Sequence, residues 1–192
     1  MPFEEMSLLD YAINASLVIS NTVINKYDKA GLIAFNNEIH TILPAERRNS
    51  QMEKIQQSLY KLKSGFSEPD YEMLYTLIRR KIRQRSLLIL FTNIESMASM
   101  HRYSNIFGRL AKEHVLLVVL FENTEIQKLL DNEAKSLDEV YIKTIAEKFI
   151  LEKKLIAREL NRRGVHTVLT KPAGLSVSLI NSYLEFKSNG II

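Results

Sequence analysis

The sequence predicts an α/β protein whose doubly wound, mostly parallel sheet carries one antiparallel edge strand. Apolar runs of strand length alternate with amphipathic segments of helix length in the second half of the chain; the runs cover residues 87–91, 115–121 and 165–170. This alternation is typical of parallel strands joined by right-handed helical crossovers. The sheet is expected to lack its first strand, because the chain begins with a helix that ordinarily follows such a strand; the resemblance described below implies that this strand is a central one.

A hairpin is predicted near the start of the chain. A short apolar run at residues 30–35 is followed by Asn36 and Asn37, and then by the alternating segment 38–43. Asparagine pairs between strand-like runs favour a tight turn. The two strands are therefore expected to pair in antiparallel fashion at a sheet edge, with Pro44 closing the second strand.

Capping residues mark the helices in the first half of the chain. Ser7 and an acidic residue three positions later form a capping box, which predicts a helix over residues 8–25. Ser50 opens a second helix that ends at Gly65. Pro69 is expected in the first turn of a third helix, which finishes in a run of basic residues.

Similar signals mark the helices in the second half. After the strand at 87–91, a helix is expected to begin at Ser96, and a short helix is expected to begin at Thr124. The longest helix runs from Ser136 to Arg163, and a closing helix follows at residues 177–187. The longest helix carries an apolar stripe of the kind that faces a core, formed by Tyr141, Ile145, Phe149, Leu155, Ile156 and Leu160.

Composition sets limits on the classes of function. The chain has 192 residues, is 46% hydrophobic and contains no cysteine, so a single domain over residues 1–192 is expected, and disulfides and thiolate chemistry are excluded. The apolar runs fall well short of the ~20 residues that cross a bilayer. This segment is therefore predicted to be cytoplasmic, without membrane contact of its own, although the parent protein can carry a membrane anchor elsewhere.

Catalytic signatures are absent from the sequence. It contains no nucleophile elbow, zinc-protease motif, phosphate loop or dinucleotide fingerprint, and its four histidines have no metal-like spacing. The prediction is a protein that is not an enzyme and that has no cofactor. A basic group that includes Arg79 and Arg85 suits a solvated helix end better than a nucleic-acid surface, because aromatic residues are not interleaved with it.

Polar residues at the end of the strand at 87–91 form the candidate site. Ligands of open α/β sheets bind at the carboxyl ends of strands. Thr92, Asn93 and Glu95 follow that strand directly, and Asp70 is expected nearby. These four residues are candidates for binding a partner. The alternative interpretation is that Asn93 and Asp70 only cap helices.

Five segments distributed along the chain carry a family resemblance: 9–14 (LDYAIN), 28–35 (DKAGLIAF), 69–71 (PDY), 85–92 (RSLLILFT) and 181–187 (NSYLEFK). Their sequence and order resemble the von Willebrand factor A-like (vWA-like) domain of bacterial proteins in the domain-of-unknown-function fifty-eight family, whose genes often lie beside those of MoxR-type AAA+ ATPases. The resemblance covers nearly the whole chain. It implies a Rossmann-like sheet and a role in protein binding, as an accessory or adaptor to such an ATPase.

The resemblance also implies a degenerate metal site and a truncated domain. Such domains often bind a divalent cation through an Asp-x-Ser-x-Ser loop after the first strand, a threonine, and an aspartate after the fourth strand. Here the first loop is missing, no threonine lies within residues 67–70, and Asn93 takes the aspartate position. No metal is expected. Met1 is expected to be an internal residue of a longer protein, and the missing strand is expected to come from another molecule, by domain swapping or by direct pairing of strand edges.

Two functions of other classes stay open. One is a hydrolase or nucleotide-binding enzyme on a similar sheet, because a fold does not fix a function. The other is a basic nucleic-acid-binding module, which would show strongly salt-dependent affinity.

Overall fold

The computed structural model describes residues 6–48, 50–63, 65, 67–131 and 136–192. The chain divides into two compact units. Unit 1 is formed by Gln84–Gly174 with the extreme ends of the chain, and unit 2 by Ser7–Arg83 and Leu175–Ile191. The prediction of a single domain remains a prediction.

Unit 1 is built on a three-stranded parallel sheet. Its strands β3 (Leu87–Phe91), β4 (Val115–Phe121) and β5 (His166–Thr170) lie in the order β3-β4-β5. The bounds of β3 and β4 match the predicted bounds, and the predicted parallel pairing is confirmed.

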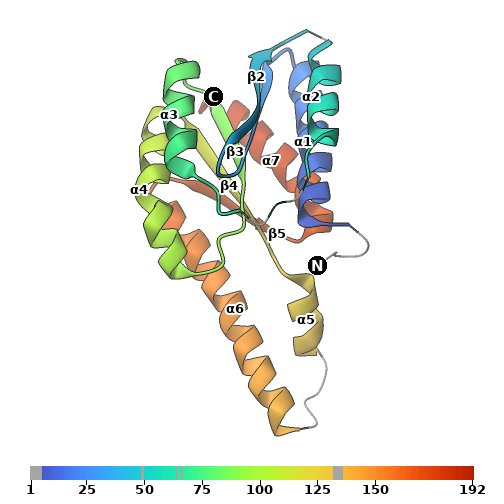
Figure 1. Cartoon of the computed structure of the whole chain (residues 1–192), viewed down its shortest axis with the longest axis vertical. Coiled ribbons are helices and arrows are strands. Elements are labelled where there is room, and N and C mark those ends of the chain that lie inside the picture. Colours follow the sequence, from blue (N-terminus) through green and yellow to red (C-terminus); the bar gives the residue numbers. More distant parts are fainter. Residues whose placement is uncertain (1–5, 49, 64, 66, 132–135) are drawn as a thin grey trace. The chain divides into compact units, whose positions relative to one another are not determined.

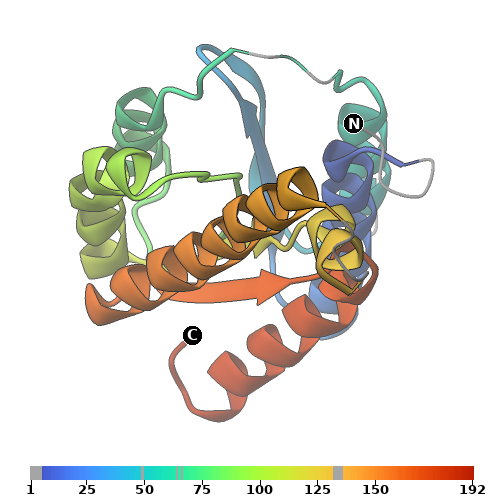
Figure 2. The same cartoon turned by 90° about the horizontal axis from the view of Figure 1, so that it is seen from below.

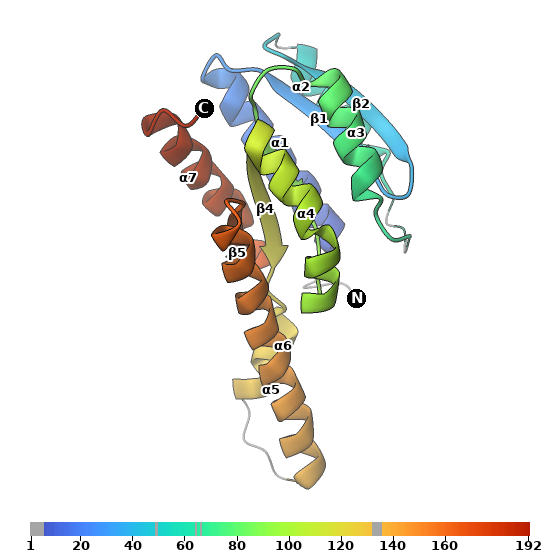
Figure 3. The ribbon, with the colours of Figure 1, turned by 90° about the vertical axis from the view of Figure 1, so that its left-hand side faces the viewer.

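Helices connect the strands of unit 1. Helix α4 (Met97–Glu113) joins β3 to β4, while α5 (Thr124–Asp131) and α6 (Leu137–Arg162) join β4 to β5. Two right-handed crossovers that advance in the same direction place their helices on the same face of a sheet, and α4 and α6 lie together in this way (Figures 1 and 3). The 3₁₀ turn η1 (Pro172–Gly174) follows β5.

The core of unit 1 is centred on β4. All seven residues of this strand are buried, as expected for a parallel strand with neighbours on both sides. From α4, Met100 and Phe107 are fully buried. From α6, Ile156 and Leu160 are also fully buried.

Unit 2 combines a β-hairpin with four helices. Strands β1 (Ala30–Phe35) and β2 (Ile39–Glu46) pair in antiparallel fashion, as predicted. The helices of this unit are α1 (Leu8–Asn25), α2 (Ser50–Tyr60), α3 (Tyr71–Lys81) and α7 (Leu175–Ser188). The chain is thus a mixed α/β protein with two sheets among its described residues, one parallel and one antiparallel. A continuous doubly wound sheet stays a prediction.

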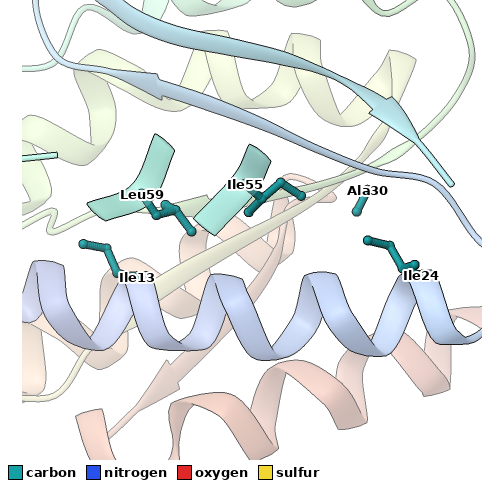
Figure 4. Packing of buried hydrophobic residues seen from close by; sticks show 5 residues of the cluster. All are labelled: Ile13, Ile24, Ala30, Ile55 and Leu59. Carbon is teal, nitrogen blue, oxygen red and sulfur yellow. The ribbon is translucent and has the colours of Figure 1, made fainter. Parts of the chain in front are cut away.

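The core of unit 2 lies between α1, α2 and the start of β1. Figure 4 shows these three elements contributing Ile13 and Ile24, Ile55 and Leu59, and Ala30, respectively. Next to Ala30, the backbones of β1 and β2 approach so closely that a Cβ atom on Gly31 would lie 2.8 Å from the carbonyl oxygen of Leu43. Glycine is therefore required at this irregular part of the hairpin.

Gln51 joins α2 to both strands of the hairpin. This side chain is buried, and its Nε2 donates to the carbonyl oxygen of Ala30 at 2.9 Å and to that of Pro44 at 2.8 Å. The hairpin register shifts between Ala30 and Leu32, so a side-chain donor supplies hydrogen bonds at the point where the strand pairing is irregular.

Four predicted signals need correction. Helix α2 ends at Tyr60 instead of continuing to Gly65. Pro44 lies inside β2 instead of closing it, which is tolerated because β2 is an edge strand. Pro69 precedes α3, whose N-cap is Asp70. The first turn of α5 is capped by Asn123, whose Oδ1 accepts from the amides of Glu125 and Ile126, so Thr124 is not the capping residue.

The apolar stripe predicted for α6 is largely exposed. Of its six residues only Ile156 and Leu160 are buried, whereas Tyr141, Ile145 and Phe149 are exposed. Periodicity correctly indicated an apolar face. It did not indicate that the described residues of unit 1 would leave that face uncovered along the first half of the helix.

We expect Gln51→Leu to destabilise the protein by about 1–3 kcal/mol, because the buried hydrogen bond to Ala30 and the part-buried one to Pro44 are both lost. Chemical denaturation would measure the change. Gln57→Leu on the exposed side of the same helix is the matched control and should change stability by less than about 0.5 kcal/mol. Equal effects of the two variants would contradict the proposed bridging role of Gln51.

Stability should also depend on His114, a buried residue at the end of α4. Its Nδ1 has no hydrogen-bond partner among the described residues. Burial lowers the pKa of the imidazole, and the nearby charge of Glu113 opposes this effect to a smaller extent. The unfolded state therefore takes up a proton more readily than the native state, and stability should fall as pH drops below about 6.5. Denaturation curves between about pH 5 and pH 8 should show a shallower pH dependence for His114→Leu than for the exposed control His101→Leu.

Candidate functional site

The predicted site residues fall in different units. Thr92, Asn93 and Glu95 follow β3 at the carboxyl end of the parallel sheet of unit 1. The backbone amide of Thr92 still donates to Val119 of β4, at 3.2 Å, so the segment leaves the sheet immediately before Asn93. Asp70 belongs to unit 2.

Asp70 caps helix α3. Its Oδ1 accepts from the amide of Met73 at 2.9 Å, and its own amide donates to the carbonyl oxygen of Asn36, also at 2.9 Å. The capping interpretation is therefore confirmed for Asp70. It does not apply to Asn93, because the N-cap of α4 is Ser96.

Asn93 is the centre of a polar network that sequence reasoning did not find. Its Nδ2 donates to Oε1 of Glu95 at 2.9 Å, and its Oδ1 accepts a hydrogen bond from Nζ of Lys153 on α6. Next to it, Oε1 of Glu152 accepts from the amide of Met97 at 2.9 Å, which attaches α6 to the first turn of α4. Two successive residues of α6 thus hold the segment that follows β3.

The charge of Lys153 is partly desolvated. Burial lowers the pKa of its ammonium group, and the nearby carboxylate of Glu95 acts in the opposite direction. Asn93 and Glu95 are exposed, whereas Lys153 is half-buried. The network therefore presents an amide and a carboxylate to solvent with a lysine cation behind them, an arrangement suited to binding polar groups of a partner.

Lys153 was missed because it lies 60 residues from Asn93 in sequence. On α6 it is one of several lysines, and a lysine on an amphipathic helix gives no signal beyond that of a solvated face. Only the packing of α6 against the end of β3 selects this lysine from its neighbours.

A second polar cluster lies in unit 2. The hydroxyl of Tyr183 donates to Oδ2 of Asp28 at 2.5 Å, and Nζ of Lys187 contacts the same oxygen at 2.5 Å. Asp28 lies in the connection from α1 to β1, next to Tyr27, which has a positive φ of 61°. The cluster attaches α7 to that connection and joins two of the segments that carry the family resemblance.

Hydrogen bonds set the ionisation of this second cluster. Burial acts to raise the pKa of Asp28, but the hydrogen bonds from Lys187 and Tyr183 outweigh it and lower the pKa. The pKa of Tyr183 is raised by burial and then by its bond to Asp28. The aspartate is therefore ionised and the phenol protonated at neutral pH, which suits a structural contact.

The described residues contain no cluster of candidate metal ligands and no membrane-spanning helix. Within the part of the chain that the structure describes, no three histidine, aspartate or glutamate side chains gather as a cation site would require. Among the described helices, none has both the length and the apolarity to span a membrane. Comparisons of the chain with family models, curated proteins and solved structures found no match.

We expect Asp28→Asn to lower the free energy of unfolding at neutral pH, because the ion pair with Lys187 is lost. The expected loss is only about 1 kcal/mol, because the ion pair is partly exposed. The folded-state pKa of Asp28 is lowered, so its contribution is present above about pH 4 and is lost as pH falls further. The difference in melting temperature between wild type and variant should therefore be clear at pH 7 and should become smaller below about pH 4. A gap independent of pH would show that the charge of Asp28 is not its cause.

Proposed function

We propose that this chain is a non-enzymatic protein-binding domain of the vWA-like kind, which acts as an accessory or adaptor to a MoxR-type AAA+ ATPase. The observation that carries the proposal is the network of Asn93, Glu95 and Lys153 at the carboxyl end of β3. This is the end of the sheet at which open α/β proteins bind their ligands.

The strand arrangement supports the vWA-like part of the proposal. The strand orders are β1-β2 in one sheet and β3-β4-β5 in the other, so β1 and β3 are both outer strands. In the vWA order the first strand lies between the equivalents of these two. A vWA-like sheet that lacks this strand would therefore separate into one antiparallel pair and three parallel strands.

Lys153 suggests how such a site works without a metal. In a metal-containing vWA site, the cation would bind an acidic group of the partner. Here the position expected for a ligand aspartate holds the neutral Asn93, whose Oδ1 accepts from the ammonium of Lys153. We propose that this ammonium acts as a built-in cation and that the partner presents a carboxylate or carbonyl oxygen to it.

Capture of a MoxR-type ATPase by the immobilised protein tests the proposal. We expect Lys153→Glu, and the double substitution Asn93→Ala with Glu95→Ala, each to reduce capture at least about tenfold, a loss of roughly 1.4 kcal/mol. The adjacent Lys154→Glu, on an exposed position of α6, introduces the same charge change outside the network and should leave capture unchanged.

The outcomes separate the two parts of the proposal. Failure of the wild-type protein to capture any such ATPase would reject the partner. Capture that is equally strong for wild type, Lys153→Glu and the double variant would reject the site. Far-ultraviolet circular dichroism of each variant confirms that the fold is retained.

A further inference from the structure

The first half of α6 exposes a continuous row of large apolar side chains. Leu137, Tyr141, Ile145 and Phe149 follow one another at intervals of four residues and are 88%, 69%, 39% and 46% exposed. Residues four apart lie on one face of a helix. We call this row the α6 stripe. Figure 2, seen from below relative to Figure 1, shows the C-terminal half of α6 running beside β5.

Contacts among the described residues of unit 1 leave the α6 stripe uncovered and also limit its length. Helix α5 lies along another side of α6, where Nζ of Lys143 donates to the carbonyl oxygen of Leu130 at 3.0 Å and Ala146 is buried (Figure 1). Beyond Phe149, the next residue on the same face is Glu152, which contacts the first turn of α4. The uncovered face therefore spans residues 137–149, about 18 Å of helix.

This face is complementary to a second copy of itself in antiparallel orientation. Lys143 is the midpoint of the segment 137–149. When two such segments pair with their midpoints side by side, residues at equal distances on either side of Lys143 lie at the same height. Leu137 then faces Phe149 of the other copy, and Tyr141 faces Ile145. Such a self-complementary patch is what a twofold-symmetric dimer requires.

The charges on the face have the same symmetry. Asp138 and Lys148 are both exposed, and at 3.6 residues per turn both point into the arc covered by the stripe. They lie at equal distances from Lys143, so Asp138 of each copy would meet Lys148 of the other. In a parallel arrangement, each of these residues would instead meet its own like charge.

We propose that the α6 stripe is a docking surface for a second copy of this chain, paired in antiparallel fashion about Lys143 with two symmetric Asp138–Lys148 ion pairs. The surface is small, so the dimer is expected to be weak and concentration-dependent. It is independent of the polar network around Lys153 and of any pairing through strand edges.

Reversing each of the two charges separately in the full chain tests this geometry. Asp138→Lys and Lys148→Asp, studied separately by analytical ultracentrifugation, should each weaken self-association at least about tenfold, because every substitution acts twice in a symmetric dimer. An equimolar mixture of the two variants should form a heterodimer within about threefold of wild-type affinity, because two ion pairs are then present again, one with the native polarity and one reversed.

Matched controls separate this effect from damage to the helix. Glu139→Lys makes the same change of charge in the first turn of α6 as Asp138→Lys does, and Lys154→Asp makes the same change as Lys148→Asp. Glu139 and Lys154 both lie outside the arc of the stripe. Both controls should associate as wild type does. Thermal unfolding of all four variants checks that α6 remains folded.

Cross-linking distinguishes the orientation of the helices directly, because the natural chain contains no cysteine. In the antiparallel arrangement two copies of position 137 lie about 18 Å apart along the axis. A short bismaleimide should therefore join Leu137→Cys to Phe149→Cys in a mixture and should not join either variant to itself.

Three results would overturn the proposal. The first is a wild-type protein that sediments as a monomer at all concentrations, including a monomer that instead binds anionic lipid vesicles through this helix. The second is self-association that survives both charge reversals. The third is a mixture of Asp138→Lys and Lys148→Asp that does not recover.

Discussion

Unit 1 depends on the burial of one strand. β4 is apolar along its whole length and has a parallel neighbour on each side, so removing it from water is the main source of stabilisation available to this unit. The same pairing fixes the direction in which all three strands end. Because parallel strands present their carboxyl ends at one edge, the position of β4 determines where Asn93 and Glu95 emerge, and so where the proposed site lies.

Helix α6 connects the core to both proposed surfaces. Its C-terminal half buries Ile156 and Leu160 and brings Lys153 to Asn93, so the site at the end of β3 is held by a helix that is itself anchored in the core. Its N-terminal half exposes large apolar residues at the same helical period. An apolar face that continues beyond the core of its own unit is unfavourable in water unless something covers it, and the symmetric charges at Asp138 and Lys148 favour a second copy.

Unit 2 is held together by polar groups as well as by its apolar core. Gln51 supplies hydrogen bonds where the hairpin register is irregular, and Asp28 binds both Tyr183 and Lys187 of α7. These contacts join segments separated by up to 159 residues, since Lys187 and Asp28 lie at opposite ends of the chain. They account for the presence of polar residues in two of the segments on which the family resemblance rests, without requiring a catalytic role for them.

The sequence alone determined the elements whose signals are local. The Ser7 and Ser136 caps and the apolar runs of β3 and β4 indicated the bounds of helices and strands, because capping and periodicity act within a few residues. Only the tertiary structure decided which faces are covered and which distant side chains meet. It assigned Asp70 and Asn93 to different units, selected Lys153 among the lysines of α6, and left Tyr141 and Phe149 exposed. Each of these outcomes depends on the packing of one element against another, which no local pattern encodes.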